Sequence, residues 1–196
     1  MTTPTIFTLA DPATLKVLLS NVPKTYVCSY LQGLCVDPSG YLVATDGFAL
    51  AEYEHPSMVS DGLSTAVANW LVRNNRSSLI IEPWKLAARG DVLLEVRETE
   101  LLAHQGGNSI LLNSIDGTFP DWRRVSCWQK ETWPAPEAGK VPAVERICVN
   151  PHLLTRFAPR KGSVLKVEFD TEHSAMRISS VDHEVRGTLM PVRMRD

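Results

Sequence analysis

The stretch Ile6-Phe7-Thr8-Leu9-Ala10-Asp11-Pro12-Ala13-Thr14-Leu15 carries the signal on which the fold prediction rests. An apolar, β-type run is followed by aspartate, proline and, three residues after the proline, leucine. Proline at the first helical position sacrifices no hydrogen bond, and the preceding aspartate can accept from the free amides of the first turn. The stretch therefore predicts a strand that leads directly into a helix.

The same pattern occurs twice more along the chain. Residues 79–81 precede Glu82-Pro83-Trp84-Lys85-Leu86, and residues 147–149 precede Asn150-Pro151-His152-Leu153-Leu154. The three prolines lie 71 and 68 residues apart. We interpret this spacing as an internal repeat of about 70 residues, in which strand-like segments follow each predicted helix.

Three strands are expected after each helix, so each unit has the order β-α-β-β-β and the fold class is α+β, with helices on one face of antiparallel sheets. The strands fall at residues 31–36, 41–45 and 49–53 in the first unit, 92–97, 101–104 and 109–115 in the second, and 164–169, 175–180 and 184–192 in the third. We divide the chain into a domain over 1–125, a linker over 126–141 and a half-domain over 142–196. The domain contains half-units 1–60 and 78–125 and an inserted amphipathic helix over 63–73.

Composition excludes several classes of protein. Of the 196 residues 44% are hydrophobic and 21% are charged, which is typical of a globular chain. The longest apolar runs, at 41–44 and 48–51, have four residues, far fewer than the roughly 18 of a membrane helix. No secretory signal is recognised at the start, so a cytoplasmic location is expected. The four cysteines form no C-x-x-C pair, which predicts reduced thiols and neither a metal site nor a cofactor.

Basic residues are concentrated in the three predicted helical windows, 12–24, 83–90 and 151–162. The chain as a whole has a net charge of −2, yet these windows contain no acidic residue. Their basic residues are Lys16, Lys24, Lys85, Arg89, Arg156, Arg160 and Lys161. Such a distribution favours non-sequence-specific contact with the phosphates of double-stranded DNA. The alternative is ordinary solvated helix faces with cations near their C-terminal ends.

Two motifs and the C-terminal segment resemble the bacterial DNA polymerase III beta sliding clamp family. Val43-Ala44-Thr45-Asp46-Gly47-Phe48-Ala49-Leu50-Ala51 and Asp116-Gly117-Thr118-Phe119-Pro120-Asp121-Trp122-Arg123-Arg124-Val125 are similar to two signature stretches of its middle domain. Leu189-Met190-Pro191-Val192-Arg193-Met194 is similar to its last strand and tail. The resemblance implies domains built from pairs of β-α-β-β-β halves, arranged in a ring whose helices line a DNA-sized hole.

The chain departs from that family in extent. The family has six half-units and this chain has three, so we expect a truncated relative made of the middle domain plus the last half of the C-terminal domain. An unpaired half-domain leaves a sheet edge open, and we expect the third unit to pair with its copy in a second chain, giving a homo-oligomer. The turn after Gly47 also differs, because Phe48-Ala49 stands where the family commonly has a polar, basic pair.

The resemblance further implies a pocket that accepts a short hydrophobic peptide from DNA polymerase or other partners. The matching positions are Leu31, Thr45, Gly47, Leu50, Pro120, Arg124, Val125, Thr188, Met190, Pro191, Val192 and Arg193. Aliphatic walls, an adaptable methionine and arginines that can hold a carboxylate suit a peptide. Leu50 and Met190 taken alone are equally consistent with ordinary core packing.

These observations predict a non-enzymatic DNA replication factor that tethers or recruits a polymerase on duplex DNA. One alternative is a clamp-derived peptide-binding protein that does not encircle DNA and competes for clamp-binding partners, and another is a simple DNA-binding regulator. A hydrolase or nuclease would draw on Asp182-His183-Glu184 with Asp46, Asp116 and Asp121, but these residues have no catalytic or metal-binding spacing.

Overall fold

The computed structural model describes residues 4–25, 28–56, 62–86, 90–129, 148–169 and 174–191. The helices within these ranges are α1 (Pro12–Ser20), α2 (Leu63–Arg73) and α3 (Pro151–Thr155), with 3₁₀ turns η1 (Ser29–Leu31), η2 (Pro83–Lys85) and η3 (Trp122–Arg124). The strands are β1 (Thr5–Ala10), β2 (Leu34–Asp37), β3 (Tyr41–Thr45), β4 (Ala49–Glu54), β5 (Leu79–Ile81), β6 (Val92–Val96), β7 (Leu101–Gln105), β8 (Asn108–Leu112), β9 (Leu165–Glu168), β10 (Met176–Ser180) and β11 (Arg186–Leu189). None of the described helices has the length and apolar character to cross a membrane.

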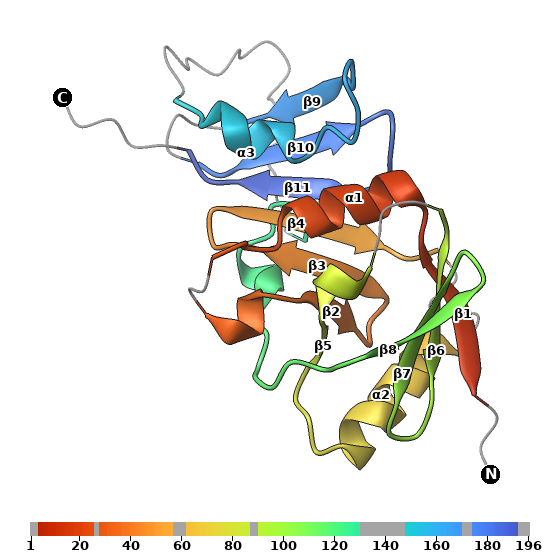
Figure 1. Cartoon of the computed structure of the whole chain (residues 1–196). Coiled ribbons are helices and arrows are strands. Elements are labelled where there is room, and N and C mark those ends of the chain that lie inside the picture. Colours follow the sequence, from red (N-terminus) through yellow and green to blue (C-terminus); the bar gives the residue numbers. More distant parts are fainter. Residues whose placement is uncertain are drawn as a thin grey trace.

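The strands form two antiparallel sheets, which confirms the predicted α+β class (Figure 1). One sheet has the order β1-β6-β7-β8 and the other β5-β2-β3-β4-β11-β10-β9. The first strands of units one and two are exchanged, because β1 pairs with β6 (Thr5 opposite Val96) and β5 pairs with β2 (Ile81 opposite Leu34). Units one and two therefore interlock, and neither completes a sheet alone.

The seven-stranded sheet also joins unit three to unit one. Strands β4 and β11 pair with Leu50 opposite Thr188, Ala51 opposite Gly187 and Glu52 opposite Arg186. One edge of unit three, expected to meet a second copy of the chain, is therefore covered by β4 of the same chain. The other edge, β9, lies at the end of the sheet. Pairing β11 satisfies backbone groups that an open edge would expose.

Helices α1 and α3 lie on one face of this sheet, called the helix face (Figure 1). As the sequence predicts, Asp11 caps α1 by accepting from the amides of Ala13 and Thr14 at 2.8 and 3.1 Å. Asn150 caps α3 in the same way, accepting from the His152 amide at 3.0 Å. Leu15 and Leu18 of α1 are fully buried in the main core.

The structure does not form the helix that the sequence predicts over 83–90. Pro83–Lys85 forms only a 3₁₀ turn, and Leu86 is already extended at φ −95° and ψ 128°; residues 87–89 lie outside the described residues. Glu82 gives this turn no side-chain cap. Its carboxylate instead accepts from the Asn113 side chain at 2.9 Å. Glutamate is too long to replace aspartate or asparagine as a cap, so the start of the helix lacks the support that α1 and α3 have.

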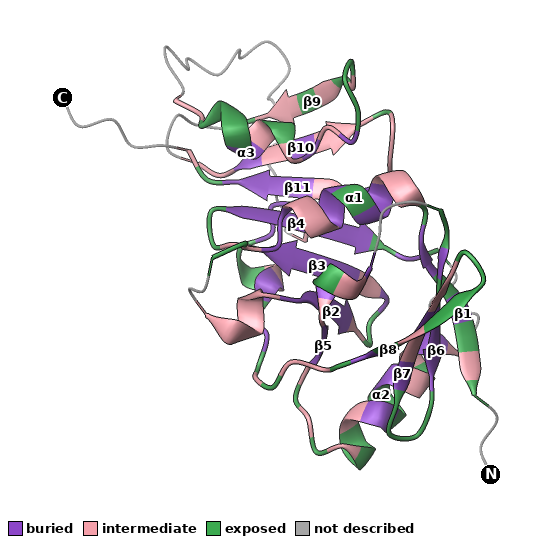
Figure 2. Cartoon of the chain, in the orientation of Figure 1, coloured by how far each residue is buried: buried purple, intermediate pink, exposed green. Residues whose placement is uncertain are grey.

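Two apolar clusters cover the two faces of the seven-stranded sheet. Alternate side chains of a strand point to opposite faces, so Ala44 and Ala51 join the main core beneath α1, whereas Val43 and Leu50 point the other way. The side opposite the helices, called the outer face, carries a second cluster whose buried members are Cys35, Val43, Leu50, Ile80, Phe119 and Trp122. Burial is continuous through β2, β3 and β4, which lie between the two clusters (Figure 2).

Gly187 lets the β4–β11 seam close over the core. A Cβ atom at this position would lie 2.5 Å from Cε1 of Phe157, which is fully buried.

We expect Gly187→Ala to lower the free energy of unfolding by about 1–3 kcal/mol through overpacking, measured by urea unfolding. In a Phe157→Leu background, which removes the ring atoms in the way, the added cost of Gly187→Ala should fall. Equal costs in the two backgrounds would contradict this account.

Candidate functional site

The structure brings together five of the residues assigned to the peptide pocket, at the outer end of the β4–β11 seam. Leu50 is opposite Thr45 on β3 and Thr188 on β11. The Thr45 hydroxyl donates to the Ala49 carbonyl at 2.8 Å and accepts from the Gly47 amide at 3.1 Å. The backbone amide of Met190 donates to the Phe48 carbonyl at 3.0 Å. These bonds fix the β3–β4 turn against the end of β11.

Burial separates these residues into a floor and a rim. Leu50 is only 3% exposed, because Val43 and Trp122 pack around it in the second cluster and Leu31 packs against that cluster. Met190 and Val125 are 39% and 45% exposed. Leu50 therefore supports the site from below and is not a wall, and the accessible apolar surface belongs to Met190 and Val125.

Five predicted pocket residues remain to be placed. Pro120 and Arg124 are exposed, next to the buried rings of Phe119 and Trp122. Pro191 follows Met190 directly and is partly buried. Val192 and Arg193 lie outside the described residues.

One end of residues 122–129, called the connector, is held by Asp37 at the end of β2. Its carboxylate accepts two hydrogen bonds from the Arg123 guanidinium, at 2.9 and 3.1 Å, and one from the Trp122 indole at 3.3 Å. The guanidinium also stacks over the Trp122 ring, 4.4 Å from its centroid. Burial would raise the pKa of Asp37, but the hydrogen bonds from Arg123, Ser39 and Trp122 outweigh it and lower that pKa to about 2.

The other end of the connector crosses the β4–β11 seam on the outer face. The Cys127 amide donates to the Thr188 hydroxyl at 3.1 Å, and the Trp128 indole donates to the Gly187 carbonyl at 2.9 Å. Arg177 of β10 donates to the Cys127 carbonyl at 2.7 Å and lies over the Trp128 ring, 4.9 Å from its centroid. The sequence had suggested an irregular linker from residue 126. Residues 126–129 are instead hydrogen-bonded to β4 and β11 of the sheet. No pattern in the sequence indicates the roles of Trp128 and Arg177.

Glu52 of β4 lies fully buried beneath the connector. Its Oε1 accepts from the Gln129 side chain at 3.2 Å, whereas its Oε2 has no hydrogen-bond partner among the described residues. Burial raises the pKa of Glu52, and hydrogen bonds from Ser126 and Gln129 offset this only in part. The connector thus covers an acidic group whose ionisation is unfavourable.

The predicted DNA-contacting cations lie on α1, on η2 and around α3, and several already have partners within the protein. Arg156 pairs with Asp46 at 2.5 Å, and both side chains are mostly buried. Lys16 donates to the Pro159 carbonyl, and Lys85 donates to the Leu111 carbonyl at 3.1 Å.

Four of these cations remain on the surface, and Lys16 is one of them despite its hydrogen bond to Pro159. Arg160 pairs with Asp182 at 2.6 Å but is still 75% exposed. Lys24 and Lys161 are exposed. Arg89 lies outside the described residues. The exposed positive charge of the described part is therefore smaller than the count in the sequence suggests.

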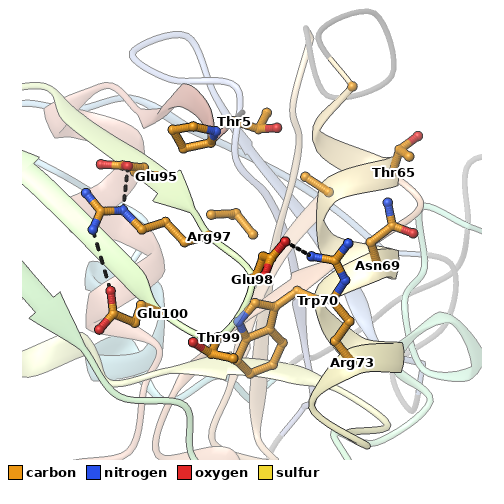
Figure 3. Close-up of a pocket in the computed structure, with 14 residues that line it drawn as sticks. Thr5, Thr65, Asn69, Trp70, Arg73, Glu95, Arg97, Glu98, Thr99 and Glu100 are labelled. Atoms are coloured by element: carbon orange, nitrogen blue, oxygen red, sulfur yellow. Dashed lines mark hydrogen bonds and ion pairs between the residues drawn. The ribbon is translucent and has the colours of Figure 1, made fainter. Parts of the chain in front are cut away.

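A hollow of about 640 Å³ lies between α2 and the β6–β7 turn (Figure 3). Arg73 of α2 pairs with Glu98 at 3.1 Å, and Arg97 pairs with Glu95 at 2.7 Å and with Glu100 at 3.5 Å. The arginines are matched by carboxylates, so this hollow offers no surplus of positive charge to a nucleic acid. The inserted helix that forms one wall agrees with the predicted bounds.

Three of the acidic residues considered for catalysis each pair with a different arginine. Asp46 pairs with Arg156, Asp182 with Arg160 and Asp116 with Arg76. His183 accepts from the Val185 amide through Nδ1 and contacts the Phe157 carbonyl through Nε2 at 2.8 Å, so both ring nitrogens are occupied. Within the described ranges, no group of three or more potential metal ligands comes together.

Asp37 provides a direct test of the connector. We expect Asp37→Asn to lower the free energy of unfolding at pH 7 by about 2 kcal/mol, because one pKa unit corresponds to about 1.4 kcal/mol. The pKa of Asp37 in the folded protein lies below its ordinary value of 3.8. The loss should therefore be complete above about pH 4 and should shrink as the pH falls toward 2. The exposed Asp121→Asn is the matched control, and an equal effect of the two substitutions in urea unfolding would contradict the assignment.

Comparison with known proteins identifies the fold. No family model and no curated protein matches the sequence. Among solved structures, a DNA polymerase III beta sliding clamp from Bartonella birtlesii is 20% identical, with a TM-score of 0.57 over 97% of this chain and 66% of that chain. The Caulobacter crescentus clamp is 17% identical, with a TM-score of 0.60 over 99% of this chain and 68% of its own.

The H. pylori clamp is 12% identical, with a TM-score of 0.63 over 99% of this chain and 68% of that chain. This chain thus has the fold of the beta sliding clamps and spans about two thirds of their length. The resemblance seen in the sequence is confirmed for the fold.

Proposed function

We propose that this protein is a sliding-clamp-like DNA replication factor that recruits a DNA polymerase, or another DNA-processing protein, through the groove beside Met190. The observation that carries the proposal is the meeting of the β3–β4 turn, the end of β11 and the connector on the outer face. These segments are far apart in the sequence and contain the motifs that resemble the clamp family. The clamp fold supports the same conclusion.

The rim of this groove suits an apolar peptide side chain with an acidic neighbour. Met190 and Val125 offer apolar surface that is accessible to a partner. Arg124 is exposed next to Val125 and can donate to a carboxylate or carbonyl. The buried Leu50 and the bonded connector hold the rim in place before a peptide binds, which lowers the ordering cost of binding.

The proposal includes contact between the helix face and the backbone of duplex DNA. Lys16, Lys24, Arg160 and Lys161 are the exposed cations on and beside α1 and α3. Encircling a duplex would require more half-units than the three of one chain, so we include assembly into a homo-oligomer. The edge strand β9 is the natural point of contact, because β10 is its only neighbour within the described part of the chain.

Met190 tests the peptide groove. We expect Met190→Asp to weaken binding of a labelled short hydrophobic peptide at least tenfold, because the introduced carboxylate must be desolvated beneath the peptide. Met190→Leu, which keeps an apolar side chain of similar size, should bind nearly as well as the wild type. Fluorescence anisotropy measures both, with Val181→Asp, also at an exposed apolar position, as the control. No peptide binding by the wild type at high micromolar concentration would refute the groove.

Salt dependence tests the DNA surface. Replacing Lys24 and Lys161 together with alanine should weaken duplex binding equally for unrelated sequences and lower the slope of log K against log salt by about 2. The double variant Arg73→Ala with Arg97→Ala removes the same charge from the α2 hollow and should leave the slope unchanged. If neither pair alters the slope, duplex DNA does not bind at this surface. A clamp-derived peptide-binding protein that competes for clamp-binding partners then becomes the better account.

A further inference from the structure

A hollow of about 560 Å³ on the helix face lies between the C-terminal end of α1, the β3–β4 turn and α3. Lys16 and Lys24 line it from α1 and the residues that follow, and His152 and Arg156 line it from α3. Asp46 and Phe48 line it from the β3–β4 turn. The β3–β4 turn therefore belongs both to this hollow and to the proposed peptide site.

The aromatic residue Phe48 is 66% exposed to solvent. Its amide donates to the Asp46 carboxylate at 2.9 Å, and its carbonyl accepts from the Met190 amide at 3.0 Å. Because both backbone groups are bonded, the turn holds the backbone of Phe48 in place, and its exposed side chain lines the hollow.

Positive charge surrounds this ring. Lys16, Lys24 and Arg156 contribute three cations to the hollow, against the single carboxylate of Asp46. Asp46 and Arg156 form a mostly buried pair, and the guanidinium helps keep the pKa of Asp46 below its usual range despite burial, which raises it. The two lysine ammonium groups are left as the surplus. A ligand for this hollow should therefore combine a negative charge with a flat face.

We propose that the hollow binds single-stranded DNA, with an unpaired base stacked on Phe48 and its phosphates held by Lys16 and Lys24. This inference rests on the proposed DNA-binding function and names a second form of DNA that the same face would recognise. Stacking needs an open base face, which a paired and stacked duplex does not present. An aromatic ring among cations is the combination by which proteins bind single strands without reading their sequence.

Another exposed aromatic residue on η2 agrees with this inference. Trp84 is 64% exposed and precedes Lys85. Figure 1 shows η2 on the same side of the sheet as α1. Lys85 itself pairs with Glu82 at 3.4 Å, so η2 adds an exposed ring and no surplus charge on this side of the sheet.

The test compares two labelled 12-mers of equal charge, one of thymidines and one of abasic sugars, by fluorescence anisotropy with the full chain. We expect the wild type to bind the thymidine 12-mer more tightly than the abasic one. Phe48→Ala should weaken thymidine binding about fivefold or more and leave abasic binding unchanged. Phe48→Trp should restore the preference. Val72→Ala, at an exposed position on α2, is the control.

Equal affinity of the wild type for the two 12-mers, or full thymidine binding by Phe48→Ala, would overturn the stacking site. In either case, duplex binding that depends on Lys24 and Lys161 would leave the proposed DNA function standing. Loss of binding to the 12-mers and to the duplex alike would refute both. Peptide binding measured on Phe48→Ala shows whether the turn is intact, because Met190 bonds to the same residue.

Discussion

The pairing of β4 with β11 is the constraint on which the rest of this structure depends. It places Leu50 opposite Thr188 and so joins segments more than a hundred residues apart into one seven-stranded sheet. A shift of one residue would move Leu50 and Glu52 from the outer face into the main core. Gly187 and Phe157 oppose such a shift, because the ring fits only where the strand has no side chain. The position of Met190 beside the β3–β4 turn and the hollow beside Phe48 both depend on this register.

The connector supplies part of the surface that we propose as the peptide site. Asp37 fixes one end of it through Arg123 and Trp122, and backbone and side-chain bonds to β11 fix the other. Between them, Val125 is left exposed on a segment that cannot collapse onto the sheet. This arrangement buries Glu52, because the connector crosses β4 above its carboxylate. One oxygen of that carboxylate has no hydrogen-bond partner among the described residues, which is unfavourable.

The charged residues on the helix face hold the structure together and also lie at the proposed DNA site. Arg156 and Lys16 both tie unit three to unit one, the first through Asp46 and the second through the Pro159 carbonyl. The same two cations border the hollow beside Phe48. Their side chains are thereby held in place, so a nucleic acid bound at the proposed site would not have to order two long flexible side chains. The contacts that stabilise the fold therefore also fix the positions of the Arg156 and Lys16 charges.

The sequence by itself determined the features that arise within a few residues. Asp11-Pro12 and Asn150-Pro151 begin helices because their caps are local, and the spacing of Leu63, Val67 and Trp70 specifies α2. The two motifs and the tail also identified the fold, because they place particular residues at particular turns.

Only the tertiary structure decided which strands exchange sheets, that Leu50 is buried in the second cluster, and that Arg156 pairs with Asp46 across 110 residues. Such contacts depend on the register of every strand between them, and no local pattern records that register.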